Sequence, residues 1–113
     1  MTSEELEPRR SRRRPIPETL VEVETTTGDK KRWVVDAVDL SADGMCLVLP
    51  NELKMATRVQ LTFRLDDGTE ISRVPAIVQH HEPGVGGVQF DEWDEDDRLA
   101  LLEYLVHRYE HDA

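Results

Sequence analysis

Between residues 19 and 90, turn-forming residues divide the sequence into short segments in which apolar and polar residues alternate. The clearest segment is 57–65 (TRVQLTFRL), followed by Asp66–Asp67–Gly68 with the Asp-Gly signal of a tight hairpin. Its apolar positions are Val59, Leu61, Phe63 and Leu65. Strict alternation over so few residues is typical of β-strands with one buried face. The pattern therefore predicts a mainly antiparallel β-structure.

Six such segments follow one another along the chain. We expect strands at 20–24, 31–38, 45–49, 57–65, 69–81 and 85–90. Pro75 cannot donate to a strand ladder, so it suggests an edge or a bulge in the fifth strand. Residues 39–44 (DLSADG) have the composition of a turn between the second and third strands.

After residue 90 the period of the pattern changes from two residues to that of a helix. We expect this helix from about Asp94 to Glu110, with its acidic first turn favoured by the helix dipole. Its apolar stripe would consist of Leu99, Leu102, Leu105, Val106 and Tyr109. Basic residues near its end are His107, Arg108 and His111. Six short strands followed by one helix predict a small barrel or curled sheet with a helix packed on one side.

The length of the chain, 113 residues, is that of one domain. Residues 1–8 are polar and expected to be disordered, and residues 9–113 are expected to form the single domain. No apolar run approaches the ~20 residues of a membrane span, and none resembles an export signal. The single cysteine, Cys46, excludes an internal disulfide, so a cytoplasmic location is expected. We expect Cys46 to be a buried thiol because its strand is apolar.

Charge is distributed unevenly along the chain, which carries a formal net charge of −10. Residues 1–14 contain five arginines and three glutamates, whereas the remainder contains nine basic and 21 acidic residues. An acidic body disfavours DNA or RNA, whose binding normally uses several basic contacts to phosphates. A short basic segment on such a body suits a small anion better.

The basic segment offers two overlapping pairs of arginines. Arg9 and Arg13 lie four residues apart, and so do Arg10 and Arg14. The planar guanidinium group binds phosphate through two parallel hydrogen bonds and also stacks on flat rings. Taken alone, the segment also fits an exposed basic tail. Pro15 and Pro17 enforce an extended path after it.

The turn at 39–44 carries a second group of polar residues. Asp39 can accept paired hydrogen bonds from a purine edge with adjacent N–H donors, and Ser41 can donate to phosphate or brace the turn. We expect Gly44 to supply a backbone angle that other residues resist. The spacing also imitates the start of a calcium loop, but the twelfth position, where such a loop needs glutamate, is Pro50.

Together these features resemble the PilZ domain family. An Arg-x-x-x-Arg pair precedes the first strand, and Asp-x-Ser-x-x-Gly follows the second. Residues 13–17 (RRPIP), 34–47 (VVDAVDLSADGMCL) and 87–90 (GVQF) resemble further parts of the family pattern. The resemblance covers about residues 9–110. It implies a six-stranded antiparallel β-barrel, at residues 18–90, with the C-terminal helix at 94–110.

The resemblance also implies a ligand, the bacterial second messenger cyclic di-GMP. It assigns ligand binding to Arg9 and Arg13, or in the alternative register Arg10 and Arg14, together with Asp39, Ser41 and Gly44. The position of Pro15 favours Arg9 and Arg13. The tryptophan that some members stack on a base is absent here, and Gln79 or His80 is the expected substitute.

The implied function is that of a cytoplasmic receptor without cofactor or metal. The arginine loop, residues 9–17, would become ordered on the ligand and relay the signal to a protein partner. The alternative is a PilZ-like adaptor that works through protein contacts without ligand. We expect a monomer or weak dimer and no enzyme, because no nucleophile motif or phosphate-cradling loop is present. Trp33 and Trp93 are expected to pack, and His107 and His111 lack a third zinc ligand.

Overall fold

The computed structural model describes residues 14–107. The strands are β1 (Arg14–Pro15), β2 (Leu20–Thr25), β3 (Arg32–Leu40), β4 (Gly44–Leu47), β5 (Arg58–Arg64), β6 (Glu70–Glu82) and β7 (Val85–Phe90), and the helix is α2 (Glu95–Leu105). The tail expected at 1–8 lies outside the described residues. Within them, no helix is long and apolar enough to cross a membrane.

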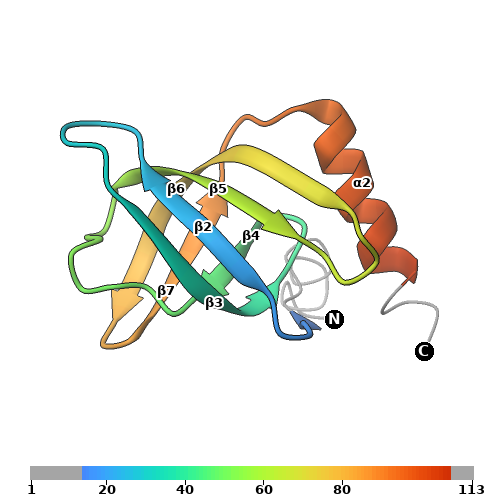
Figure 1. The fold of residues 1–113 in the computed structure, drawn as a ribbon, viewed down its shortest axis with the longest axis horizontal. Coiled ribbons are helices and arrows are strands. Elements are labelled where there is room, and N and C mark those ends of the chain that lie inside the picture. Colours follow the sequence, from blue (N-terminus) through green and yellow to red (C-terminus); the bar gives the residue numbers. More distant parts are fainter. Residues whose placement is uncertain (1–13, 108–113) are drawn as a thin grey trace, which may run out of the picture.

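Six of these strands close into an antiparallel barrel (Figure 1). Their order is β3-β2-β5-β6-β7-β4, and pairing between β3 and β4 completes the ring. The predicted six-stranded barrel with a C-terminal helix is therefore confirmed. The sequence did not predict β1, which pairs only with the end of β3.

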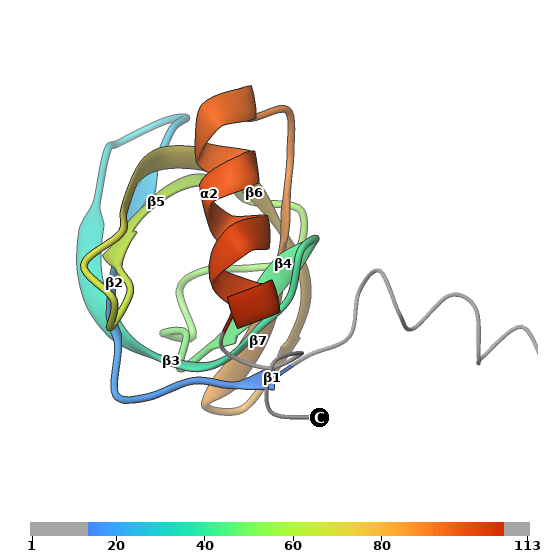
Figure 2. The ribbon, with the colours of Figure 1, turned by 90° about the vertical axis from the view of Figure 1, so that its right-hand side faces the viewer.

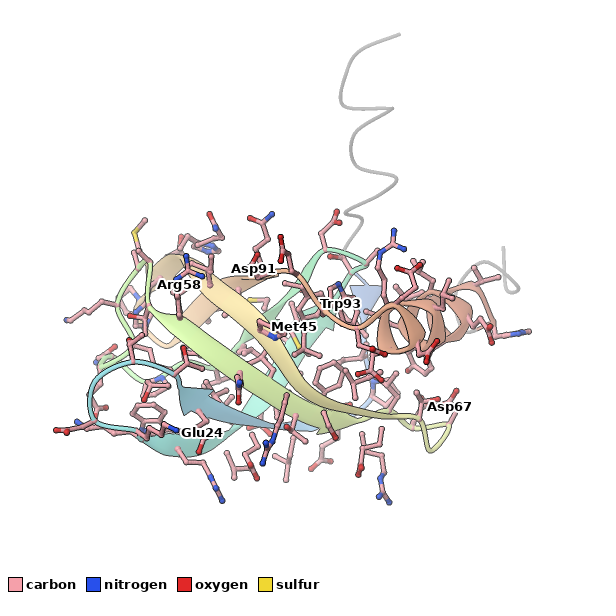
Figure 3. All side chains as sticks on the ribbon, turned by 90° about the horizontal axis from the view of Figure 1, so that it is seen from above. Glu24, Met45, Arg58, Asp67, Asp91 and Trp93 are labelled. Carbon is pink, nitrogen blue, oxygen red and sulfur yellow. The ribbon has the colours of Figure 1, made fainter. Side chains whose placement is uncertain are left out.

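Alternation along the strands fills the interior. On β5, Val59, Leu61 and Phe63 are buried as predicted, and Met45 of β4 points into the barrel with them (Figure 3). Charged side chains lie outside, as Arg58 and Asp91 do, with an Nη1–Oδ2 distance of 3.3 Å. The inward-facing side chains form a single apolar core. The strand register decides which residues belong to it.

Helix α2 crosses one end of the barrel (Figure 2). It begins at the N-cap Asp94, whose carboxylate accepts hydrogen bonds from the backbone N–H groups of Asp96 and Asp97. Before it, Trp93 packs on Phe90 with the ring centroids 4.8 Å apart. The helix therefore starts as predicted, close to the rim of the barrel.

The predicted apolar stripe names the wrong residues as the side of the helix that faces the barrel. The buried residues are Leu101 and Tyr104, whereas Leu99 and Val106 are 46% and 54% exposed. Leu105 is only partly buried against the core. Tyr109, Arg108 and His111 lie outside the described residues.

Three register shifts interrupt the strand ladders. One lies between Ala37 and Asp39 on β3, and another between Val78 and His80 on β6. The third, in the β5–β6 ladder, adds a residue on β6 near Arg73, which has a φ of 54°. Pro75 follows this bulge. The β6–β7 ladder ends at the pair Ala76–Phe90, so Pro75 has no partner residue on β7. Because bulges bend strands and redirect side chains, the first two decide where the predicted site residues point.

Candidate functional site

The two predicted motifs meet at the edge where β1 pairs with β3. Arg14 lies opposite Leu40, and Pro15 lies opposite Asp39. The end of the arginine segment is thereby fixed beside the Asp-x-Ser turn. Arg9, Arg10 and Arg13 lie outside the described residues, and Arg14 is described by its backbone pairing alone.

A bulge at the end of β3 sets the direction of Asp39. Ala37 pairs with Leu47, but Asp39 pairs with Cys46 only one residue further back along β4. The extra residue, Val38, lets both Val38 and Asp39 face outward while Leu40 turns into the core. Asp39 belongs to the strand and not to the turn, which corrects the predicted boundary at 38.

The Asp39 carboxylate is oriented by the neighbouring strand. Its Oδ1 accepts a hydrogen bond from the backbone N–H of Cys46 at 3.2 Å. The bond holds the carboxylate at the outer surface of β3.

Ser41 braces the turn, one of the two roles considered for it. Its side chain is fully buried; the hydroxyl donates to the carbonyl of Gly44 and accepts from the N–H groups of Asp43 and Gly44, each at 3.2 Å. These bonds satisfy backbone groups that a turn between two strands leaves without a ladder partner. The other role, donation to phosphate, does not fit a hydroxyl that is occupied and removed from solvent.

Gly44 is required for a different reason from the one predicted. The φ of Gly44 is not positive, so the expectation of an unusual backbone angle was wrong. A Cβ atom at this position would instead lie 2.1 Å from the carbonyl oxygen of Val88 on β7. Glycine is needed because β4 and β7 approach closely at this point.

A row of paired residues extends from Asp39 across the barrel wall, in which Cys46 is half-buried and Gly87 is buried. Asp39 pairs with Cys46, Cys46 with Gly87, and Gly87 with His80, on strands β3, β4, β7 and β6. The second bulge exposes both Gln79 and His80. Three strand spacings separate Asp39 from His80, or roughly 14 Å.

The imidazole of His80 lies over Gly87. A Cβ on Gly87 would come within 2.8 Å of His80 Nδ1, so the absence of a side chain makes room for the ring. The ring therefore forms one flat end of the row whose other end is Asp39. His81 pairs with Gly86 and is less exposed than His80, so the two histidines do not act together.

Cys46 is not the buried thiol that the sequence predicted. It is intermediate in exposure, between the buried Met45 and Leu47, because it lies on the outer wall of the barrel. The expectation failed because its neighbours are apolar while alternation turns Cys46 outward. The two tryptophans do pack as expected, Trp33 and Trp93 both lying partly buried against the core.

Sequence reasoning missed Gly87 and the Cys46 backbone as parts of this surface. A signal was present: the apolar positions on β3 change parity, from Val35 and Ala37 to Leu40, and such a change marks a bulge. Across residues 14–107, no three His, Cys, Asp or Glu side chains are placed to hold a metal ion. The row places an oriented carboxylate at one end and an exposed imidazole at the other, groups that can bind a planar polar ligand.

Comparisons with known proteins agree with this architecture. The model of a family described as the PilZ domain matches residues 7–107. The PilZ domain of CeSA from a cellulose-synthesizing bacterium has 23% sequence identity and a TM-score of 0.66, with 86% of this chain and 97% of that one covered. No curated protein matches the sequence.

Two other solved structures are longer than this chain. The MrkH–c-di-GMP complex of K. pneumonia is 18% identical with a TM-score of 0.67, and 87% of this chain covers 50% of that one. The Bacillus subtilis inhibitor of motility, MotI, is 20% identical with a TM-score of 0.64, and 88% of this chain covers 50% of it. The chain thus spans about half the length of each, and at these identities the likeness shows the fold.

Proposed function

The chain belongs to the PilZ domain family, and from this premise we propose that it binds cyclic di-GMP with its arginine segment and Asp39 and relays binding to a protein partner. PilZ domains are receptor and adaptor domains. One of the structures with the same fold is a complex of MrkH with c-di-GMP.

The observation that carries the proposal is the pairing of β1 with β3. Pro15 lies opposite Asp39, so the chain enters the barrel beside the carboxylate. In the sequence, one residue separates Arg13 from Pro15, and this spacing favours the pair Arg9 and Arg13. Arg9 and Arg13 are therefore the proposed phosphate-binding pair, with Arg10 and Arg14 as the alternative.

Each group in the proposed site has a chemical role. The arginines bind the phosphates of the dinucleotide through paired charged hydrogen bonds. Asp39, oriented by the Cys46 amide, accepts hydrogen bonds from the adjacent N–H donors of a guanine edge. His80 gives a flat imidazole for base contact, and Ser41 contributes by holding the turn.

Charge supports a small anionic ligand at this place. Residues 14–107 contain nine Lys or Arg and nineteen Asp or Glu, so the barrel repels anions in general. The arginines of 9–14 form the local concentration of positive charge. Binding would order this segment against the barrel, and that ordering is the proposed signal to the partner.

Isothermal titration calorimetry with the full chain tests the proposal. Cyclic di-GMP should bind the wild type, and Arg13→Ala or Asp39→Asn should weaken binding by at least about tenfold, equal to about 1.4 kcal/mol. Arg12→Ala is the matched control and should bind nearly as the wild type does. A greater loss for Arg10→Ala than for Arg9→Ala would assign the alternative register.

The outcome also separates a receptor from the ligand-independent adaptor. If the wild type is folded, as judged by its amide spectrum, and still gives no binding heat, the receptor function is contradicted. Binding that Arg13→Ala and Arg14→Ala leave unchanged would contradict the proposed site while keeping the ligand.

A further inference from the structure

Outer-wall side chains of β2, β3 and the segment after β4 form an apolar strip beside the proposed ligand row. The strip consists of Leu20, Val34, Val38 and Val48, which are 58%, 62%, 43% and 43% exposed. Three of these residues lie on β2 and β3, the strands that run across the front of the barrel in Figure 1. Single exposed apolar residues are ordinary, but here four of them lie around one position of β3, and such clustering points to an interaction surface.

The strand register shows that the four side chains surround one carboxylate. Leu20 pairs with Asp36, and the backbone N–H of Val48 donates to the Asp36 carbonyl at 2.9 Å. Val34 and Val38 precede and follow Asp36 along β3. Asp36 is exposed, and its side chain forms no ion pair within residues 14–107. The strip is thus an apolar surface with an unpaired negative charge at its centre.

From this arrangement we propose that the strip, Leu20, Val34, Asp36, Val38 and Val48, binds a short segment of a partner protein in which apolar side chains flank a lysine or arginine. The apolar side chains cover the valines and Leu20, and the basic group meets Asp36. The inference deepens the partner half of the proposed function, and the relay rests on that function. The strip itself follows from the barrel alone.

The size of the strip favours a short segment over a second copy of the chain. Two strand spacings separate Leu20 from Val48, roughly 10 Å, and four residues along β3 separate Val34 from Val38, roughly 13 Å. A stable interface buries about 800 Å² on each partner, far more than four side chains supply. A symmetric pair would also bring two acidic domains together, each with nineteen acidic and nine basic residues in 14–107.

Charge favours a basic partner for the same reason. The net negative charge of the barrel draws a cationic segment toward it and raises the association rate. Charged neighbours on the same wall are already paired: Arg32 lies 3.7 Å from both Glu22 and Glu24. Asp36 is therefore the group that would select a basic side chain of the partner.

The strip also adjoins the proposed ligand row. Val38 and Asp39 are consecutive residues of the same bulge, and both face outward. A change in the Asp39 position on ligand binding would move Val38 at the edge of the strip. This contact gives a physical route by which the dinucleotide controls the partner.

Selection of random displayed peptides on the immobilised full-length protein, without dinucleotide, tests the proposal. Enriched peptides should carry a lysine or arginine flanked by apolar residues. Their affinity, measured by fluorescence anisotropy, should fall at least about tenfold for Val34→Glu and for Asp36→Lys. Met55→Glu is the matched control, because Met55 is also 62% exposed but lies in the loop before β5, outside the strip.

Several results would overturn the inference. They are acidic consensus sequences, equal affinity for Val34→Glu and the wild type, or sedimentation showing a dimer that Val34→Glu dissociates. Because no dinucleotide is present, these results are independent of the calorimetry. Loss of cyclic di-GMP binding leaves the peptide result standing, and the converse also holds.

Discussion

At the scale of single residues, Gly44 shows how a close backbone approach fixes a residue type. A Cβ there would meet the Val88 carbonyl at 2.1 Å and Gln89 Cα at 3.1 Å, both backbone atoms that cannot turn aside. Gly44→Ala should therefore destabilise the barrel by about 3 kcal/mol or more, since overpacking must shift β4 from β7. Urea unfolding followed by tryptophan fluorescence measures this change.

Gly68→Ala is the matched control for that substitution. Gly68 has a φ of 94°, yet no atom lies within 4 Å of its Cβ position. Only backbone strain remains there, which costs about 1–2 kcal/mol. Equal losses for the two variants would contradict the packing explanation.

Asp67 provides a prediction for pH at the same scale. Its carboxylate accepts a hydrogen bond from the Thr69 N–H at 2.8 Å, and bonds with Thr69 hold the pKa of Asp67 below its usual value of 3.8. A lowered pKa stabilises the fold above that value, and the contribution is lost as pH falls through the folded pKa. The destabilisation caused by Asp67→Asn should thus be largest near pH 6 and should shrink along a urea-unfolding series run from pH 6 down to about 2.5.

Asp97 serves as the control of opposite sign. Partial burial, together with Asp94 and Asp96, raises the pKa of Asp97. Protonated Asp97 stabilises the fold at low pH, and this stabilisation is lost as pH rises. The stability of Asp97→Asn relative to the wild type should therefore increase toward neutral pH. The same slope for both variants would contradict these assignments.

The sequence predicted where the candidate residues lie better than it predicted their structural roles. Asp39 and Ser41 were identified from turn chemistry, and both lie where β1 meets β3. The use of the Ser41 hydroxyl inside the turn and the Val88 contact of Gly44 depend on tertiary neighbours. A local pattern carries no information about a strand that arrives 44 residues later.

At the scale of elements, helix α2 shows where periodicity fails. Leucines at 99, 101, 102 and 105 lie on several sides of the helix, so the pattern does not fix which side is buried. In the structure, Leu101 and Tyr104 pack into the core, and the Tyr104 hydroxyl donates to Asp66 Oδ1 at 2.6 Å. Strand positions were predicted well because alternation has only two phases.

Truncation of leucines on opposite sides tests this packing. Leu101 is 0% exposed, so Leu101→Ala should lower the free energy of unfolding by about 2–4 kcal/mol. Leu99 is 46% exposed, and Leu99→Ala should cost less than about 1 kcal/mol. Chemical unfolding followed by circular dichroism measures both, and a larger loss for Leu99→Ala would contradict the observed phase.

At the scale of the whole molecule, charge couples folding to ligand binding with opposite signs. Residues 14–107 contain nineteen acidic and nine basic residues, so the compact form is destabilised by self-repulsion that salt screens. Raising sodium chloride from about 10 mM to about 150 mM, which shortens the screening length from about 30 Å to about 8 Å, should raise the midpoint of thermal unfolding. The same change should weaken cyclic di-GMP binding, because it screens the arginine–phosphate attraction.

A charge-reduced variant separates this screening from general salt effects. Glu52, Glu82 and Glu92 are exposed and form no ion pair within residues 14–107, so their replacement by glutamine removes repulsion without breaking a contact. The triple variant should show a higher midpoint at low salt and a smaller increase on adding salt, measured by differential scanning calorimetry. A salt dependence equal to that of the wild type would show that self-repulsion is not its source. In that case the negative charge would not affect the stability of the fold. Its role would then be to attract the basic partner segment, while the arginines attract the anionic ligand.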